Sequence, residues 1–321
     1  MSSSSSNPVL PAVATTLGAA VTQAYLLAAK PPAGRAPVEP SGWIATGGKV
    51  SGYLRLSQVW EEFGLWYVNG SDKTQMLLAL RGTVTKADAE VDGDSTTVDF
   101  VPAENITLLP TPKVHAGFYN LYTDTQDGVS TASMRTQILS ALTTLAASGL
   151  SALYITGHSL GGALAELLSL DVALSGLLPK SAVQTISFAA PMVGEAANWG
   201  LAYAANVTTS FAVINQDDIV PTQPNLPGWG SVGTPFALLF FHKQNDFSKD
   251  ELITRHSMSN HLFVLQQGIG LTPQQWAGSF TDSVFVGQSD TSADPSFSAS
   301  STSSPASAGF GAPTITSLVA P

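Results

Sequence analysis

Short apolar runs alternate with segments of helical periodicity along most of the chain, and this alternation predicts its elements. Met134, Ile138, Leu142 and Leu145 recur at helical spacing, which predicts a helix over 133–147. Two more helices are expected, one apolar nearly all round after residue 159 and one at 195–205. Buried strands are expected at 63–68, 76–80, 152–155, 183–189 and 210–214. Strands and helices in alternation indicate a mostly parallel sheet covered by helices on both faces.

The two ends of the chain differ from its middle in composition. Residues 12–29 are apolar and predict a helix that packs on the domain, and a loop rich in Pro and Gly is expected at 31–48. Residues 1–7 and 288–321 are dominated by small and polar residues, which cannot form a packed core. We therefore expect one domain at 8–287 between a disordered N-terminus and a disordered tail.

Composition narrows the class of protein. The 321 residues are 44% hydrophobic and only 11% charged, which allows one large domain with a substantial core. The formal net charge is −10 and no basic cluster is visible, so nucleic acid is not an expected partner. There are no cysteines, which excludes disulfides, thiolate catalysis and cysteine-ligated metal sites.

The N-terminal sequence gives no clear targeting signal. It lacks the basic region of a secretory signal peptide. The apolar stretch 12–29 includes Thr and Gln and is short for a membrane span. We expect a soluble protein, either cytoplasmic or exported by a non-classical route.

One strand-to-helix junction carries a nucleophile motif. Gly157-His158-Ser159-Leu160-Gly161 lies between the apolar run 152–155 and an apolar helix. A GxSxG match in that context predicts a nucleophile elbow, a sharp turn that leaves the serine hydroxyl exposed at its tip. The two glycines let the strand and the helix approach closely. Ser159 is therefore the expected nucleophile.

The partners of a nucleophilic serine can be sought by chain order. The serine needs a histidine base, and the base needs a carboxylate to hold its tautomer. In hydrolases with this elbow the order is serine, acid, histidine. Asp217 and Asp218 follow the strand at 210–214, where an acid is expected. Among the five histidines, those that follow the elbow and remain candidates for the base are His242, His256 and His261.

Four motifs resemble those of the class 3, fungal-type triacylglycerol lipases. They are Leu80-Arg81-Gly82-Thr83, Val114-His115-Ala116-Gly117-Phe118, the elbow with Gly162 and Ala163, and Asp217-Asp218-Ile219-Val220-Pro221. They occur in the order of that family and cover roughly residues 60–265. The resemblance implies an α/β-hydrolase fold.

The resemblance also implies roles for individual residues. Ser159 is the implied nucleophile and Asp218 the acid. The implied oxyanion hole consists of backbone N–H groups of Thr83 and Leu160. Arg255-His256-Ser257-Met258-Ser259-Asn260-His261-Leu262 resembles the family's histidine segment, in which the first histidine is the base. That favours His256, with His261 as the alternative because the segment His261-Leu262-Phe263 resembles a second family pattern.

The function implied is hydrolysis of lipid esters through an acyl-enzyme, as in a triacylglycerol lipase or an esterase. A phospholipase A1-type activity and a non-catalytic binding protein with a hydrolase fold are the alternatives. No cofactor or metal is expected. The expected partner is a lipid or another ester, with transient contact to a lipid surface, and no protein partner is predicted. The segment after Thr83 is acidic and polar, so it lacks the apolar face expected of a lid that opens at a lipid surface.

Overall fold

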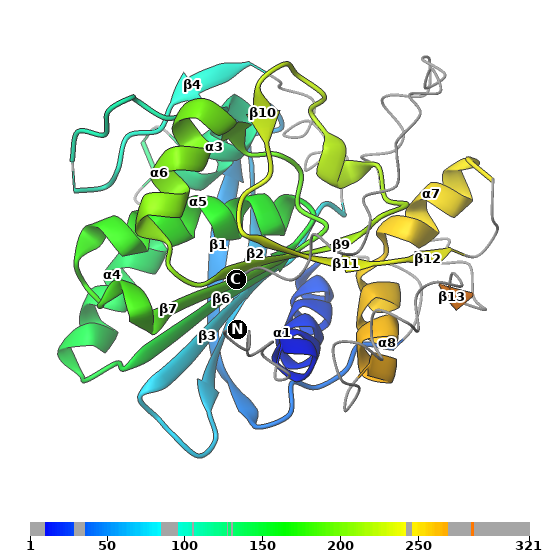
Figure 1. Cartoon of the computed structure of the whole chain (residues 1–321). Helices are drawn as coiled ribbons and strands as arrows, with labels where there is room; N and C mark the ends of the chain where they lie inside the picture. Colours follow the sequence, from blue (N-terminus) through cyan, green and yellow to red (C-terminus); the bar gives the residue numbers. More distant parts are fainter. Residues whose placement is uncertain are drawn as a thin grey trace, which may run out of the picture.

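The structure is a computed structural model of the whole chain, shown in Figure 1. It describes residues 10–28, 36–84, 96–104, 106–126, 128–129, 131–241, 246–268 and 284–285. The expected disordered ends, 1–7 and 288–321, lie outside these residues. His242 and most of the acidic segment after Thr83, residues 85–95, also lie outside them.

A seven-stranded sheet forms the centre of the molecule, in the order β1-β2-β3-β6-β7-β9-β11. β1 and β2 run antiparallel to their neighbours, and the pairs from β3 to β11 are parallel. The strands are β1 (Trp43–Leu54), β2 (Val59–Asn69), β3 (Gln75–Leu80), β6 (Ala152–His158), β7 (Val183–Phe188), β9 (Ser210–Asn215) and β11 (Thr234–Leu238). Because β3, β6, β7 and β9 are parallel, their carboxyl ends share one edge of the sheet.

Helices cover both faces of this sheet (Figure 1). One face packs on the helices α3 (Ala116–Thr123), α4 (Met134–Ala147), α5 (Leu160–Ser175) and α6 (Leu201–Asn206). The other packs on α1 (Leu10–Ala24) and α8 (Met258–Gly268), which lie side by side, with η1 (Tyr25–Leu27) following α1. β3 shows the alternation, since Leu78 and Leu80 enter the first core and Leu77 and Ala79 the second.

The remaining elements border the central sheet. A four-stranded sheet has the order β10-β8-β5-β4, formed by β4 (Thr97–Asp99), β5 (Lys113–His115), β8 (Gly194–Glu195) and β10 (Trp229–Gly230). β12 (Phe240–Phe241) pairs with β13 (Val284–Phe285). The other helical segments are η2 (Lys180–Ala182), the π-helical η3 (Ala196–Gly200), η4 (Val220–Thr222) and α7 (Lys249–His256).

Most of the expected elements are present, and two expectations were wrong in part. The loop expected at 31–48 is a strand from Trp43 onward, because β1 begins there. The helix expected at 195–205 begins as the short strand β8, then becomes π-helical and α-helical. The glycines at 47 and 48 and the polar side chains of β1 concealed that strand, since it lies at the edge of the sheet with one exposed half.

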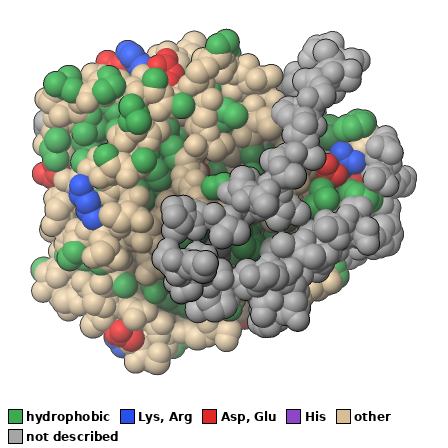
Figure 2. Space-filling model, in the orientation of Figure 1, with side chains coloured by type: hydrophobic (Ala, Val, Ile, Leu, Met, Phe, Trp, Pro, Cys, Tyr) green, Lys and Arg blue, Asp and Glu red, His purple; other side chains and the backbone are tan. Residues whose placement is uncertain are grey.

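The surface reflects the low charge content of the chain. On the face drawn in Figure 2, charged side chains are scattered, and Lys and Arg do not gather into a patch. Hydrophobic side chains recur over the same face, between the backbone and the other uncharged residues. Within the part of the chain that the structure describes, no helix is both long enough and apolar enough to span a membrane.

Candidate active site

Ser159 occupies a strained turn between β6 and α5. Its backbone angles are φ 56° and ψ −128°, a conformation that non-glycine residues seldom adopt. A side chain at Gly157 would overlap the carbonyl of Gly161. The tight approach of strand and helix therefore requires glycine, as expected of a nucleophile elbow.

The oxyanion candidates lie directly beside this turn. Thr83 follows the end of β3, which pairs with β6 so that Leu80 lies opposite Gly157. A methyl group on Gly82 would come within 2.9 Å of Ser159 Cβ, which places the backbone before Thr83 against the nucleophile. Leu160 is the first residue of α5, where a backbone N–H has no carbonyl of its own helix to bond. The backbone before Thr83 and the first residue of α5 thus lie beside Ser159.

Asp218 and His256 form a buried pair. His256 Nδ1 lies 2.7 Å from Asp218 Oδ2, and the two residues are 2% and 4% exposed. The other carboxylate oxygen, Oδ1, accepts a hydrogen bond of 2.9 Å from the backbone N–H of Val220. With both oxygens engaged, the carboxylate can fix the orientation and the tautomer of the imidazole.

Asn215 connects Asp218 to the helix that ends at His256, and no local pattern in the sequence marks it. This residue ends β9, three residues before Asp218. Its side-chain amide donates to the carbonyl of Arg255, directly before His256, and to that of Phe240, each at 2.9 Å. The backbone N–H of Phe240 in turn donates to Asn215 Oδ1 at 3.1 Å. The strand that leads to Asp218 thereby holds the end of α7, where His256 lies.

The structure separates the alternative histidines. His261 lies in α8 and is fully buried. Its Nδ1 donates to the carbonyl of Ser257 at 2.9 Å, so this nitrogen is used within its own helix. Burial lowers the pKa of His261 to about 4. His256, and not His261, is hydrogen-bonded to the acid through its ring.

His158, inside the elbow, is also fully engaged. One ring nitrogen lies 2.6 Å from the hydroxyl of Tyr25 and the other 2.7 Å from the carbonyl of His256. Burial lowers the pKa of His158 well below its usual value, and the nearby His256 and His261 lower it further. His158 is therefore neutral at neutral pH.

Arg81 and His115 make the contacts of structural residues. The Arg81 guanidinium donates to the backbone carbonyls of Glu62 and Gly82 and pairs with Glu61 at 2.6 Å. His115 caps α3, and its ring stacks on Phe118 at 3.9 Å between centroids. These contacts hold the end of β3 and the start of α3 in place.

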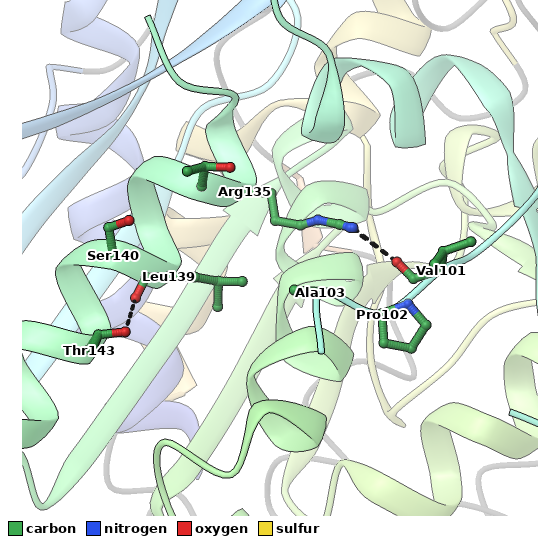
Figure 3. Close-up of a pocket in the computed structure, with 8 residues that line it drawn as sticks. Val101, Pro102, Ala103, Arg135, Leu139, Ser140 and Thr143 are labelled. Atoms are coloured by element: carbon green, nitrogen blue, oxygen red, sulfur yellow. Dashed lines mark hydrogen bonds between the residues drawn. The ribbon is translucent and has the colours of Figure 1, made fainter. Parts of the chain in front are cut away.

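Among the described residues, no cluster of three or more His, Asp and Glu side chains could hold a metal ion. A cavity of about 360 Å³ lies elsewhere, between α4 and the segment 101–103 (Figure 3). None of Ser159, Asp218 and His256 lines it. Arg135 crosses its mouth to the carbonyl of Val101, and its Nε lies 3.4 Å from Asp171. Because its one guanidinium is already paired, this cavity is a weak candidate for an anion site.

Comparison with known proteins adds sequence relatives. Residues 77–227 match the family described as lipase (class 3). A phospholipase A1-Igamma2 of Arabidopsis thaliana, described as chloroplastic, is 33% identical over 201 residues. The match covers 54% of this chain and 37% of the length of the plant protein. This chain therefore corresponds to well under half of that relative.

Comparison with solved structures shows the fold. A lipase of Rhizopus microsporus var. chinensis has a TM-score of 0.54 at 19% identity, covering 79% of this chain and 86% of that one. A triacylglycerol lipase whose catalytic centre is described as a serine protease triad has a TM-score of 0.52 at 19% identity, covering 81% and 95%. The predicted α/β-hydrolase fold is confirmed.

Proposed function

The chain belongs to the class 3 lipase family, and from this premise we propose that it is a serine hydrolase of carboxylic esters that acts on lipids. The hydrogen bond between His256 and Asp218, beside the strained turn at Ser159, is the observation that carries the proposal. A hydrolase-fold protein that only binds ligands has no need of a buried acid–histidine pair next to an elbow. The pair therefore supports catalysis over recognition alone.

The proposed reaction begins with acylation of the serine. The Ser159 hydroxyl attacks the ester carbonyl while His256 Nε2 takes the hydroxyl proton. The carbonyl oxygen becomes an oxyanion, which the N–H groups of Thr83 and Leu160 stabilise. The tetrahedral intermediate then collapses, the carbon–oxygen bond to the alcohol breaks, and His256 gives its proton to the departing alcohol. An acyl-enzyme on Ser159 remains.

Deacylation repeats the same proton transfers with water. His256 takes a proton from a water molecule, which attacks the acyl carbonyl, and then returns the proton to Ser159 Oγ as the acid is released. The Asp218 carboxylate stabilises the imidazolium that forms twice in each cycle. Each transfer uses the same ring nitrogen, because Nδ1 of His256 is held by Asp218.

Within lipid esters, we infer two candidate substrate classes. Glycerides are suggested by the fold shared with triacylglycerol lipases. Phospholipids are suggested by the sequence match to a plant phospholipase A1. Both substrates are attacked by the same acyl-transfer chemistry, so the difference lies in the head group that the entrance to the site accepts.

The first test is hydrolysis of p-nitrophenyl esters from acetate to palmitate, with Ser159→Ala as the paired variant. We expect the wild type to cleave these esters and the variant to lose activity by about 10⁴-fold or more. The chain-length profile then separates an esterase from a lipase. If both proteins are inactive at every chain length, the results would favour a non-catalytic binding protein over a hydrolase.

A second assay separates the two lipid classes. Triacylglycerol emulsions and phosphatidylcholine vesicles labelled in the sn-1 or the sn-2 chain are offered to the same enzyme. Release of the sn-1 chain in preference to triacylglycerol cleavage would favour phospholipase A1 activity. Cleavage of triacylglycerol alone would favour a lipase.

A further inference from the structure

A hydrogen-bond chain links the N-terminal segment of the molecule to the candidate base. Tyr25, in η1, lies 2.6 Å through its hydroxyl from Nδ1 of His158. Nε2 of the same ring lies 2.7 Å from the carbonyl oxygen of His256. All three residues are less than a tenth exposed. Tyr25 and His256 both fall outside residues 77–227, which match the family.

The chemistry of the three groups fixes the position of each proton. A backbone carbonyl can only accept, so Nε2 of His158 must carry the proton of that hydrogen bond. In a neutral ring the other nitrogen, Nδ1, is then a lone pair, and the Tyr25 hydroxyl must donate to it. The depressed pKa of His158 agrees with a neutral ring. The chain of donors therefore runs in one direction, from Tyr25 through His158 to the backbone of His256.

We infer that Tyr25 and His158 are positioning residues for the base His256. His158 holds the carbonyl of His256 at the point where α7 ends and α8 begins, and the Tyr25 hydroxyl holds the His158 ring in the orientation that allows it to do so. The rings of His158 and His256 lie 4.6 Å apart between centroids, so a rotation of the first ring would displace the second. This inference rests on the proposed function for its effect on turnover.

The Tyr25 hydroxyl also lies against the backbone at Gly82, just after the end of β3. A methyl group at Gly82 would overlap the Tyr25 hydroxyl, and it would come within 2.7 Å of the His158 carbonyl. Gly82 directly precedes the oxyanion candidate Thr83. The hydroxyl thus lies where the end of β3, the elbow and the histidine meet, and α1 and η1 bring it there from the opposite end of the chain (Figure 1).

The test compares Tyr25→Phe with Tyr122→Phe. Each change removes one buried hydroxyl that makes a hydrogen bond. The Tyr122 hydroxyl donates to Asp171 at 2.9 Å on the other face of the sheet. Tyr25→Phe should lower kcat by about 10- to 100-fold, because small displacements of a base are costly. KM should change less than about twofold, since the ester-binding groups are untouched. Tyr122→Phe should leave both constants near those of the wild type.

An NMR measurement tests the chain without reference to activity. Long-range correlations between the ring nitrogens and the carbon-bound ring protons show which nitrogen of each histidine is protonated and how each nitrogen is hydrogen-bonded. We expect His158 to be protonated at Nε2 in all three proteins, because the carbonyl of His256 can only accept. The resonance of its unprotonated Nδ1 should shift in Tyr25→Phe, which removes the donor to that nitrogen. The low-field resonance of the His256 Nδ1–H proton should broaden or shift in Tyr25→Phe alone.

The outcomes separate this inference from the proposed function. If Tyr25→Phe keeps the wild-type kcat and the wild-type resonances of His158 Nδ1 and His256 Nδ1–H, the positioning role is overturned. If the wild type hydrolyses no ester, the proposed function fails, and the two resonances still decide whether Tyr25 positions His256. A shift of the His158 Nδ1 resonance with an unchanged His256 resonance would also overturn the role, because the chain would then end at His158.

Discussion

Asp218 holds His256 through a hydrogen bond of 2.7 Å, and both side chains are almost completely buried. The pair joins the loop after β9 to the last residue of α7, 38 positions further along the chain. A buried carboxylate in this position does two things for a histidine base. It fixes the ring with Nε2 directed away from the acid, and it favours the imidazolium over the neutral ring.

We therefore expect Asp218→Asn to lower kcat by about 10⁴-fold, because the amide cannot stabilise the imidazolium and allows the wrong tautomer. Asp217→Asn is the matched control, since that carboxylate is adjacent in sequence but exposed. It should keep kcat within about twofold of the wild type. Steady-state hydrolysis of a short p-nitrophenyl ester measures both. Equal losses in the two variants would remove Asp218 from the mechanism.

The two histidines that the sequence left open can be separated by one pair of variants. His256→Asn should abolish turnover almost as fully as loss of the nucleophile, by about 10⁴-fold or more. His261→Asn should keep most of the activity. The new amide can still donate to the carbonyl of Ser257, the hydrogen bond that His261 Nδ1 makes. Circular dichroism confirms that both variants are folded. Inactivity of His261→Asn alone would make His261 the base.

The sequence was sufficient for the elements that repeat a local pattern. The apolar runs of β3, β6, β7 and β9 and the periodicity of α4 predicted both the sheet and its helical covering. The turn at Ser159 was recognisable because its glycines lie two residues before and two residues after the serine in the chain. The edge strand β1 was missed, since a half-exposed strand that includes glycines has no continuous apolar run.

The remaining parts of the candidate site depend on contacts between distant residues. His256 and His261 are five positions apart, and only the packing of α7 and α8 directs one of them to Asp218. Tyr25 is 133 residues from its partner His158, so no local pattern marks it. Asn215 is one of many polar residues at strand ends, and its role appears only when its two carbonyl partners are in place.

The approach of β3 to the elbow can be tested at Gly161. A side chain there would overlap the backbone carbonyls of Leu80 and Arg81, and backbone atoms cannot move aside as a flexible side chain can. We expect Gly161→Ala to destabilise the fold by about 3 kcal/mol or more, measured by urea unfolding. Gly200→Ala is the control, because its nearest neighbour would be 3.9 Å away. A Gly161→Ala protein as stable as Gly200→Ala would mean that strand and elbow lie further apart.

The buried carboxyl of Glu166 should make the free energy of unfolding depend on pH. It lies in α5 and is 3% exposed, and its side chain accepts a hydrogen bond of 2.9 Å from Ser187. Burial raises the pKa of Glu166 from 4.5 to about 8, and Ser187 offsets only part of this. Burial raises the pKa of the nearby Tyr203, and the charge of Glu166 raises it further. The carboxyl is therefore protonated in the folded protein at neutral pH, as a neutral buried group should be.

The sign of the pH effect follows from the two pKa values. Between pH 4.5 and about 8 the unfolded chain has released the Glu166 proton and the folded protein still holds it. The free energy of unfolding should therefore fall as pH rises across this window, by up to about 1.4 kcal/mol per pH unit from this group. Above the folded pKa the contribution becomes constant. Glu166→Gln, which cannot ionise, should lose this slope.

The measurement is urea unfolding of the wild type, Glu166→Gln and Glu62→Gln at intervals from pH 5 to pH 9. Glu62 is a matched control, since its carboxylate pairs with Lys49 at the surface and is 39% exposed. Its removal should change the slope little, because exposed ion pairs contribute less than about 1 kcal/mol. The comparison uses slopes and not absolute stabilities, so a constant cost of the glutamine amide in α5 does not affect it. If the slope of Glu166→Gln equals that of the wild type, Glu166 is ionised in the folded protein, and a second buried partner must compensate its charge.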